Sequence, residues 1–480
     1  MKAQRSIGVN AGLNMIRTVC QVIFPLITFP YVSRVLHIEN IGIYNFCQSV
    51  ISYFSLMAGL GISTYAIREG ARYRDDEGKL SLFASEVFSI NFISTVISYL
   101  ILGMCIYLIP RFNQYGQIMA VLSISILFTL IGSEWIFQIY EDYKYITIRG
   151  IAFQCVALIL MFVFVKNSND LFAYVLITGI SSSGANILNA ISRRKYCRIR
   201  LVINKRILKH LLPILILFAT SVATTIYTNS DITMLGFLSG NKAVGLYSVS
   251  TKIYNIVKQM LAALIIVSIP RLSSYLGEKK TEYFARTANQ ILNALVVIVV
   301  PAIVGMVALS ENIIFIIAGQ EYVNANLSLK ILAIALFFSI FSWFYTSCIL
   351  IPYRCENKVL MATIVAALAN IGLNFILIPV FQQNAAAATT VIAELLSMLI
   401  TWWYGRKYFK ASFQKNDIVS VIIGCIAIWT ICTMSEKYIS SVLLSTAFSL
   451  ITSISIYMII LLIMKNQAVK LIFEMLHIKK

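Results

Sequence analysis

Residues 10–21 read Asn-Ala-Gly-Leu-Asn-Met-Ile-Arg-Thr-Val-Cys-Gln and place an arginine inside an apolar stretch. At helical spacing one face carries the polar side chains Asn10, Asn14, Arg17 and Gln21. A guanidinium in the membrane interior costs at least about 2.5 kcal/mol unless it meets water, protein or an anion, which favours a functional role for Arg17. The alternative is that Arg17 snorkels to the interface or bonds to carbonyls of a neighbouring helix. The stretch predicts a first membrane-spanning helix with a cationic, polar face.

The whole chain has the composition of a membrane protein. Hydrophobic residues make up 59% and charged residues 12% of the 480 positions, and the mean hydropathy is +0.82. A helical span needs about 20 apolar residues, and the length of the apolar runs favours helices over a barrel. We predict an all-α polytopic protein with about 14 transmembrane helices, centred near Val19, Phe54, Val96, Ile126, Val156, Leu176, Ala219, Val257, Val297, Phe337, Ala367, Leu395, Ile426 and Ser453.

The placement of the basic residues explains the net charge of +19. If the N-terminus is cytoplasmic, 30 of the 39 Lys and Arg residues fall in inside segments, five in outside loops and four within spans. This positive-inside bias predicts that both termini are cytoplasmic, and it accounts for the charge without a nucleic-acid partner. The basic run at 193–209 is interpreted as a topology anchor that also touches anionic membrane lipids.

The cysteines and histidines predict neither a disulfide framework nor a metal site. Nine cysteines are scattered singly without a Cys-x-x-Cys pair, and only three histidines are available. We therefore expect no metal and no cofactor. The N-terminal apolar run is too long for a signal sequence and lacks a small-residue cleavage site, which favours a first span.

A stretch in the first half of the chain recurs in the second half. Ile41–Arg68 matches Val244–Arg271, 203 positions later, with five identities in 28 positions. Both copies begin with Gly-x-Tyr and end in arginine, and an even number of spans separates them. This predicts two parallel six-helix halves, an arrangement found in transporters and also possible in a channel. The expected domains are an N-terminal bundle at 1–192, a linker at 193–209, a C-terminal bundle at 210–410 and two extra helices at 411–480.

Polar faces recur in corresponding spans of the two halves. We expect these faces to line a lumen that binds substrate; the alternative is hydrogen bonding between helices, which is common for Ser and Thr in membranes. The candidate lumen residues are Asn10, Asn14, Arg17, Gln21, Gln48, Ser52, Thr225, Lys252, Asn255, Lys258 and Gln259.

The predicted lumen is cationic at its centre. Arg17, Lys252 and Lys258 lie within spans, and no carboxylate there clearly offers the two lysines enough counter-charge. A guanidinium fork suits a phosphate group, which it can bind with two parallel hydrogen bonds. Glu394 lies near the middle of an otherwise apolar span and is a candidate for coupling to H⁺ or Na⁺, or alternatively a structural hydrogen-bonding residue. Arg68 and Arg271 are expected at the cytoplasmic rim.

One segment of the second half resembles a known family. Residues 370–379 read Asn-Ile-Gly-Leu-Asn-Phe-Ile-Leu-Ile-Pro, and Ala385–Ala388, Thr389, Thr390 and Glu394 follow. This order is similar to the second-half pattern of the polysaccharide exporters, and with the first span and the Gly-x-Tyr the similarity covers about residues 1–410. The chain resembles repeat-unit flippases of the multidrug/oligosaccharidyl-lipid/polysaccharide exporter superfamily. Gln382, Gln383, Asn384 and Ala385 stand where the family usually has Gly-x-x-Gly-Ala, which leaves the turn geometry open but not the fold.

The resemblance implies a transporter that is not an enzyme. It would move an undecaprenyl-diphosphate-linked glycan of a capsule, O-antigen or exopolysaccharide from the inner to the outer leaflet of the bacterial cytoplasmic membrane by alternating access, and a glycan polymerase is a possible partner. One alternative is a lipid II flippase. Another is a multidrug antiporter of the same superfamily, which would want carboxylates in the cavity. A lipid-linked glycan polymerase or ligase would usually carry a large outer loop, and every outside loop predicted here is short.

Overall fold

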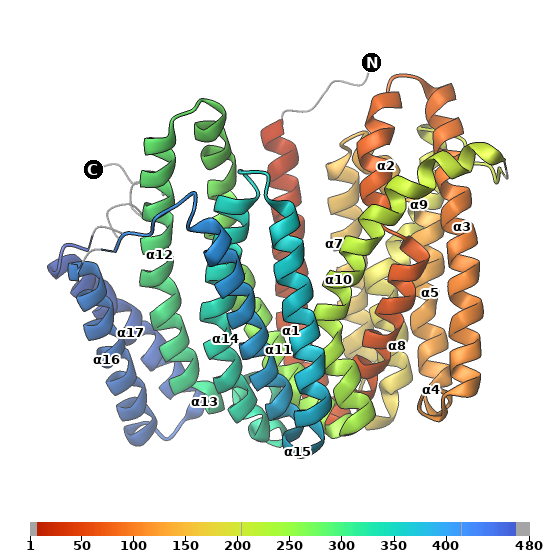
Figure 1. Ribbon diagram of the computed structural model, residues 1–480. Coiled ribbons are helices and arrows are strands. Elements are labelled where there is room, and N and C mark those ends of the chain that lie inside the picture. The colour runs from red at the N-terminus through yellow and green to blue at the C-terminus, as the bar shows by residue number, and fades with distance from the viewer. Residues whose placement is uncertain (1–6, 203, 414, 467–480) are drawn as a thin grey trace. The chain divides into compact units, whose positions relative to one another are not determined.

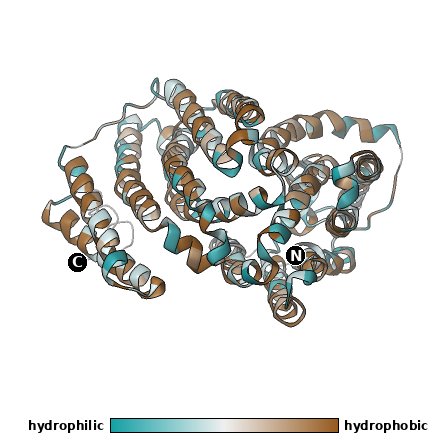
Figure 2. Cartoon of the chain, turned by 90° about the horizontal axis from the view of Figure 1, so that it is seen from below, coloured by the Kyte–Doolittle hydropathy of each residue, from teal (hydrophilic) through white to brown (hydrophobic). Residues whose placement is uncertain are grey.

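The computed structural model describes residues 7–202, 204–413 and 415–466, except for the side chains of residues 7–11, 14, 21 and 22. Every regular element in these ranges is a helix (Figure 1). Figure 2 shows hydrophobic residues along most of the length of the helices. The predicted all-α membrane fold is confirmed.

Eleven helical segments of the described ranges are long and apolar enough to cross a membrane. Two of them contain a break, at His37 in α1 (Ile7–Gly59) and at Gln382 in α15 (Glu356–Gly405), so each holds two predicted span centres. The shorter apolar helix α5 (Gly116–Gly132) holds another. All the predicted centres thus lie in helices, and the exact number of 14 crossings stays a prediction.

The chain forms two compact units, Met1–Gly245 and Leu246–Lys480. The helix α10 (Leu208–Leu238) belongs to the first unit and packs against α1. Gly236 permits this contact, because a Cβ at that position would collide with the ring of Phe46. Phe237 meets the same ring edge-on, with 5.3 Å between ring centroids. The boundary between the two compact units therefore lies after α10. The boundary between the two predicted six-helix halves lies before α10, and these halves stay a prediction.

The first unit contains ten α-helices in the described residues, besides the start of α11 (Asn241–Gly277). In chain order they are α1 (Ile7–Gly59), α2 (Ile62–Gly70), α3 (Glu77–Leu108), α4 (Pro110–Gln114), α5 (Gly116–Gly132), α6 (Trp135–Ile139), α7 (Tyr143–Phe164), α8 (Leu171–Gly179), α9 (Ala185–Ser192) and α10 (Leu208–Leu238). A π-helix at Ile180–Gly184 joins α8 to α9. The N-cap of α3 is Asp76, whose carboxylate accepts the Lys79 amide N–H at 2.9 Å; this bond and the Lys79 ammonium lower the pKa of Asp76.

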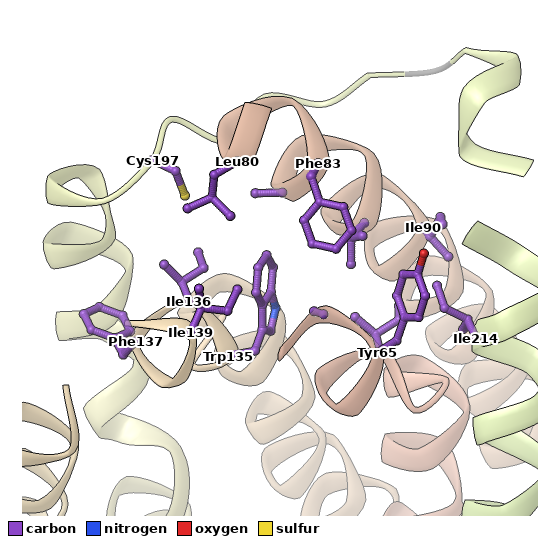
Figure 3. Close-up of a cluster of buried hydrophobic side chains, with 14 of the residues drawn as sticks. Tyr65, Leu80, Phe83, Ile90, Trp135, Ile136, Phe137, Ile139, Cys197 and Ile214 are labelled. Atoms are coloured by element: carbon purple, nitrogen blue, oxygen red, sulfur yellow. The ribbon is translucent and has the colours of Figure 1, made fainter. Parts of the chain in front are cut away.

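A core cluster holds α2, α3 and α6 together in the first unit. Figure 3 shows Trp135 and Ile139 of α6 facing Leu80 and Phe83 of α3, with Tyr65 of α2 beside them. These side chains are all at most 6% exposed. The short helix α6 is thereby fixed on both sides, which matters below because Glu134 immediately precedes it.

The basic linker lies along α3. The backbone N–H groups of Arg198, Arg200 and Val202 donate to the hydroxyls of Ser81, Ser85 and Ser89 at 2.9–3.1 Å. Every second residue of an extended chain advances about 6.6 Å, close to the 6 Å between helical residues four apart, so the two periods match. Cys197 is buried at the start of this segment, and burial raises the pKa of its thiol to about 11.

The second unit begins within α11 (Asn241–Gly277) and contains six further helices in the described residues. They are α12 (Thr281–Ala308), α13 (Ser310–Ala318), α14 (Asn326–Phe344), α15 (Glu356–Gly405), α16 (Lys415–Tyr438) and α17 (Val442–Ile463). A π-helix at Tyr345–Leu350 follows α14.

The polar residues of the second-half sequence pattern hold the two arms of α15 together. The Thr389 hydroxyl donates to Asn374 Oδ1 at 2.6 Å, and the Asn374 amide donates to Asn370 Oδ1 at 3.1 Å. All three side chains are buried. The chain reverses at Gln382, whose φ of 49° and ψ of −129° favour glycine. In this chain a glutamine therefore occupies a backbone conformation that favours glycine.

The C-terminal helices pack on α12 within the second unit (Figure 1). Tyr457 of α17 donates its hydroxyl to the carbonyl of Val297 at 2.7 Å. Gly424 of α16 lets the Tyr457 ring approach, since a Cβ there would overlap it. The helices α16 and α17 are therefore an integral part of this unit.

Candidate functional site

A helix break places a carboxylate inside the first unit. Helix α5 ends at Gly132, and Ser133 adopts φ 43° and ψ 50°, a left-handed conformation that ends the helix. Glu134 follows as the first residue of the turn that leads into α6. Because α6 is fixed in the core cluster, the Glu134 side chain has a defined position and is 25% exposed.

Two arginines share this carboxylate. Arg17 Nη2 of α1 donates to Glu134 Oε1 at 3.0 Å, and Arg149 Nη2 of α7 donates to Glu134 Oε2 at 2.6 Å. Arg149 also donates to the Ala185 carbonyl at 3.3 Å, and the Gln138 amide donates to Glu134 Oε1 at 3.4 Å. The exposed fractions are 5% for the Arg149 side chain and 28% for that of Arg17. We call Arg17, Glu134 and Arg149 the arginine cluster; its formal charge is +1.

The arginine cluster can bind an anion through its outer member. Arg149 is enclosed and holds Glu134, whereas the Arg17 side chain is partly exposed. Charge-assisted bonds from a guanidinium are the strong kind, and two parallel ones match a phosphate or carboxylate. A cation would meet a site that is already positive.

The other polar residues predicted in the first unit mostly bond within their own helices. Ser52 donates to the Ser49 carbonyl at 2.6 Å, and Gln48 is exposed. Thr225 is half-buried on α10, and its carbonyl accepts the Asn229 amide at 3.1 Å. The side chains of Asn10, Asn14 and Gln21 lie outside the described residues. Their role in a lumen stays a prediction.

A lysine and a glutamate form the corresponding charged group of the second unit. Lys258 of α11 donates to Glu394 Oε1 of α15 at 3.0 Å. The Tyr254 hydroxyl donates to the same oxygen at 3.3 Å and lies 3.5 Å from Lys258 Nζ. Glu394 is buried, and the Lys258 side chain is 24% exposed. We call Lys258, Glu394 and Tyr254 the lysine cluster; its formal charge is zero.

The remaining candidates of α11 lie near the lysine cluster in sequence. Lys252 is half-buried, and Asn255 and Gln259 are exposed. Their spacing puts Lys252, Asn255 and Gln259 on one helical face. The two rim arginines bond locally: Arg68 pairs with Glu69 at 3.3 Å, and Arg271 Nε donates to the Tyr275 hydroxyl at 2.9 Å.

The structure corrects one expectation about charge. We expected no sufficient counter-charge for Lys258 within the spans, but Glu394 pairs with it directly. The sequence shows both residues, yet they lie 136 positions apart, and only the return of α15 after Gln382 brings them together. Arg149 was missed as a site residue, because it follows Tyr143, Lys144 and Tyr145 and therefore resembles the cytoplasmic flank of a span.

Within the described residues, no group of three His, Cys, Asp or Glu side chains is arranged to hold a metal ion. All nine cysteine thiols are free. The chemistry available at the two clusters is ion pairing and hydrogen bonding.

Comparison with known sequences identifies relatives of the chain. Residues 7–276 match the family described as polysaccharide biosynthesis protein, and residues 217–380 match the MatE family. A protein of Escherichia coli (strain K12) named "Putative O-antigen transporter" is 26% identical over 391 residues, which cover 78% of this chain and 90% of that protein. The capsular polysaccharide biosynthesis protein CapF of Staphylococcus aureus is 22% identical over 386 residues, which cover 77% of this chain and 92% of CapF.

Solved structures share the fold. The lipid II flippase MurJ in an inward closed conformation superposes with a TM-score of 0.75 at 15% identity, covering 96% of this chain and 99% of MurJ. An inward-facing multidrug resistance MATE family transporter of the MOP superfamily gives a TM-score of 0.63 at 16% identity, covering 82% of this chain and 97% of that protein. The first family match spans more than half of the 480 residues. The chain therefore belongs to the polysaccharide biosynthesis protein family.

Proposed function

We propose that this flippase moves an undecaprenyl-diphosphate-linked oligosaccharide repeat unit from the inner to the outer leaflet of the bacterial cytoplasmic membrane. The glycan would belong to a capsule, an O-antigen or an exopolysaccharide, as the names of the relatives suggest. The observation that carries the proposal is the arginine cluster, because two guanidiniums on one carboxylate leave a positive charge beside an accessible Arg17. The cargo's diphosphate is the group that this charge would bind.

The membrane potential and the hydrocarbon barrier together define what the protein must do for the cargo. An inside-negative potential favours outward movement of an anion by about 2.3 kcal/mol per charge per 100 mV. The diphosphate and sugars nevertheless cannot cross hydrocarbon unaided, because polar groups there lack hydrogen-bond partners. The proposed task of Arg17, with Lys252 and Lys258, is to hold the diphosphate during alternating access and so lower this barrier. The polar residues Asn10, Asn14, Gln21, Gln48, Ser52, Thr225, Asn255 and Gln259 would meet sugar hydroxyls.

The lysine cluster suits a coupling role. Glu394 neutralises Lys258 when it is ionised, so a proton on Glu394 would release a positive charge into the second unit. In this way an H⁺ gradient would change how strongly the second unit attracts an anion during the cycle. Na⁺ is the other candidate for the coupling ion. The proposal also places both termini in the cytoplasm, makes anionic lipids the neighbours of the 193–209 linker, and allows a glycan polymerase as a partner without nucleic acid.

The proposed cargo is an anion, whereas a multidrug antiporter exports cations, and the two need opposite charges in the protein. A cationic drug needs carboxylates that are not already neutralised, whereas Glu134 and Glu394 are both ion-paired. The alternative cargo, lipid II, also carries a diphosphate and is distinguished by its sugars and peptide.

The test is reconstitution of the full chain in proteoliposomes with three cargos. These are an undecaprenyl-diphosphate oligosaccharide, lipid II and the cation ethidium, each measured for appearance on the opposite leaflet or side. We expect the oligosaccharide lipid to move fastest and ethidium not to be moved. Faster movement of lipid II would reassign the cargo, and transport of ethidium alone would refute an anion site.

A further inference from the structure

A polar cavity lies beside the arginine cluster in the first unit. Its volume is about 300 Å³, and residues of α1, α2, α3, α5, α6, α9 and the chain before α6 line it. The polar lining includes Ser55, Asn91, Thr95, Glu134, Gln138 and Asn186. Glu134 thus belongs to the cavity wall and to the arginine cluster at once, so the cavity adjoins the place where Arg17 would bind a phosphate.

One polar group of the lining has no partner within the protein. Thr95 is 2% exposed, and its hydroxyl makes no hydrogen bond in the part of the chain that the structure describes. Burying a hydroxyl without a hydrogen-bond partner is unfavourable, so such groups usually meet water or a ligand. Thr95 lines the cavity, and an occupant of the cavity could satisfy it.

The chemistry of the lining selects a neutral, hydroxyl-rich occupant. Glu134 is the single charged residue among the described residues that line the cavity, and two arginines neutralise it. Amide side chains both donate and accept hydrogen bonds, as do hydroxyls, and this combination matches the hydroxyls of a sugar. Trp135 closes one wall and is held by Leu80 and Phe83 (Figure 3). The volume is at the lower end of small-molecule sites, about 300–1,000 Å³, which suits one sugar ring better than an oligosaccharide.

We propose that this cavity is a monosaccharide subsite, which takes the sugar attached directly to the diphosphate while Arg17 binds the diphosphate itself. The inference rests on the proposed function, since it is the lipid-linked cargo that joins a phosphate to a sugar. The shared Glu134 sets the order of the two groups: phosphate at the arginine, first sugar in the cavity. The subsite binds the reducing-end sugar selectively, and the rest of the repeat unit lies outside it.

The test compares short-chain polyprenyl diphosphates with and without a sugar. The probes are citronellyl diphosphate and its conjugates with glucose, galactose and N-acetylglucosamine, bound to the purified full chain in nanodiscs. In the wild type we expect at least one conjugate to bind more tightly than the bare diphosphate. The variant Thr95→Val keeps the shape and removes the hydroxyl, and it should reduce this preference roughly two- to tenfold. Ser55→Ala combined with Thr95→Val should reduce it further.

Controls separate the subsite from the anion site. Thr401→Val makes the same substitution at a buried residue of the second unit, where the hydroxyl bonds to the Ser397 carbonyl at 2.8 Å, and should keep the preference. The pocket variants should bind bare citronellyl diphosphate as the wild type does, whereas Arg17→Ala should weaken every probe.

Two results overturn different claims. If no conjugate outbinds the bare diphosphate, or if Thr95→Val leaves the preference unchanged, the cavity holds water only and the sugar subsite is refuted. If Arg17→Ala binds the bare diphosphate normally, the anion site of the proposed function fails instead. Loss of folding does not confuse the outcome, because Thr95→Val removes a buried hydroxyl that has no described partner to lose.

Discussion

The arginine cluster of the first unit and the lysine cluster of the second unit both pair basic side chains with one carboxylate in an apolar helical unit, but they differ in the number of cations. The arginine cluster has two guanidiniums on Glu134, which is 25% exposed at a helix break. The lysine cluster has one ammonium and one tyrosine on Glu394, whose side chain is 8% exposed within a helix.

The difference shows how charged side chains can be ion-paired and still leave a net charge that attracts an anion. A carboxylate that serves two arginines leaves a charge of +1, so the arginine cluster stays attractive to an anion while every charged group has a partner. The lysine cluster is neutral, because one ammonium meets one carboxylate. The two clusters therefore differ in net charge, and we propose that anion binding belongs to the first unit and coupling to the second.

Removing Arg149 should have the largest effect on stability. Breaking a buried ion pair by deleting one partner typically costs 3–5 kcal/mol, and Glu134 keeps Arg17, so we expect Arg149→Ala to lower the free energy of unfolding by about 3 kcal/mol. Thermal unfolding of the purified protein measures this. The control Arg198→Ala, at an exposed residue of the linker, should change it by less than about 0.5 kcal/mol. Equal effects of the two substitutions would show that Arg149 does not hold Glu134.

Removing Lys258 should have a smaller effect. Lys258→Met leaves Glu394 with the hydrogen bond from the Tyr254 hydroxyl, so we expect a loss of about 2 kcal/mol. Adding Glu394→Gln removes the uncompensated charge and should recover most of that loss in the same unfolding assay. Glu394→Gln alone should abolish the proton dependence of transport at normal abundance. A double variant as unstable as the sum of the two single variants would mean that the residues do not interact.

Relief of the strained reversal in α15 should have the smallest effect. Gln382 has a positive φ that favours glycine, and Gln382→Gly should raise the free energy of unfolding by up to about 1 kcal/mol. The same exchange at Gln383, the next residue and one without a positive φ, should destabilise the protein instead. A lower unfolding temperature for Gln382→Gly would show that the Gln382 side chain is needed at the turn.

Much of the fold follows from the sequence alone. Runs of about 20 apolar residues can be satisfied in a membrane only as helices, so the predicted centres fell within helices. The two long helices that break at His37 and Gln382 were harder, because neither residue is a glycine that would mark a sharp reversal. The packing of α10 with α1 also could not be read from hydropathy, which says nothing about which apolar faces meet.

Three members of the two clusters, Arg17, Lys258 and Glu394, can be singled out from the sequence, but their ion pairs cannot. Arg17 and Glu394 stand out because a charge in an apolar helix is costly, and this cost needs no knowledge of the fold. Their partners depend on tertiary contacts across 117 and 136 positions. Arg149 was not predicted as a site residue, because the aromatic and basic residues at 143–145 resemble the membrane–water interface at the end of a span. The structure nevertheless buries its side chain.

The most direct test of the account is transport of the undecaprenyl-diphosphate oligosaccharide by Arg17 variants in proteoliposomes. Arg17→Ala removes the accessible guanidinium and should abolish appearance of the cargo on the opposite leaflet, whereas Arg17→Lys keeps the charge without the fork and should retain part of the rate. Glu134 and Arg149 remain paired in both variants, so the protein should stay folded. Normal transport by Arg17→Ala would contradict the claim that this arginine binds the diphosphate.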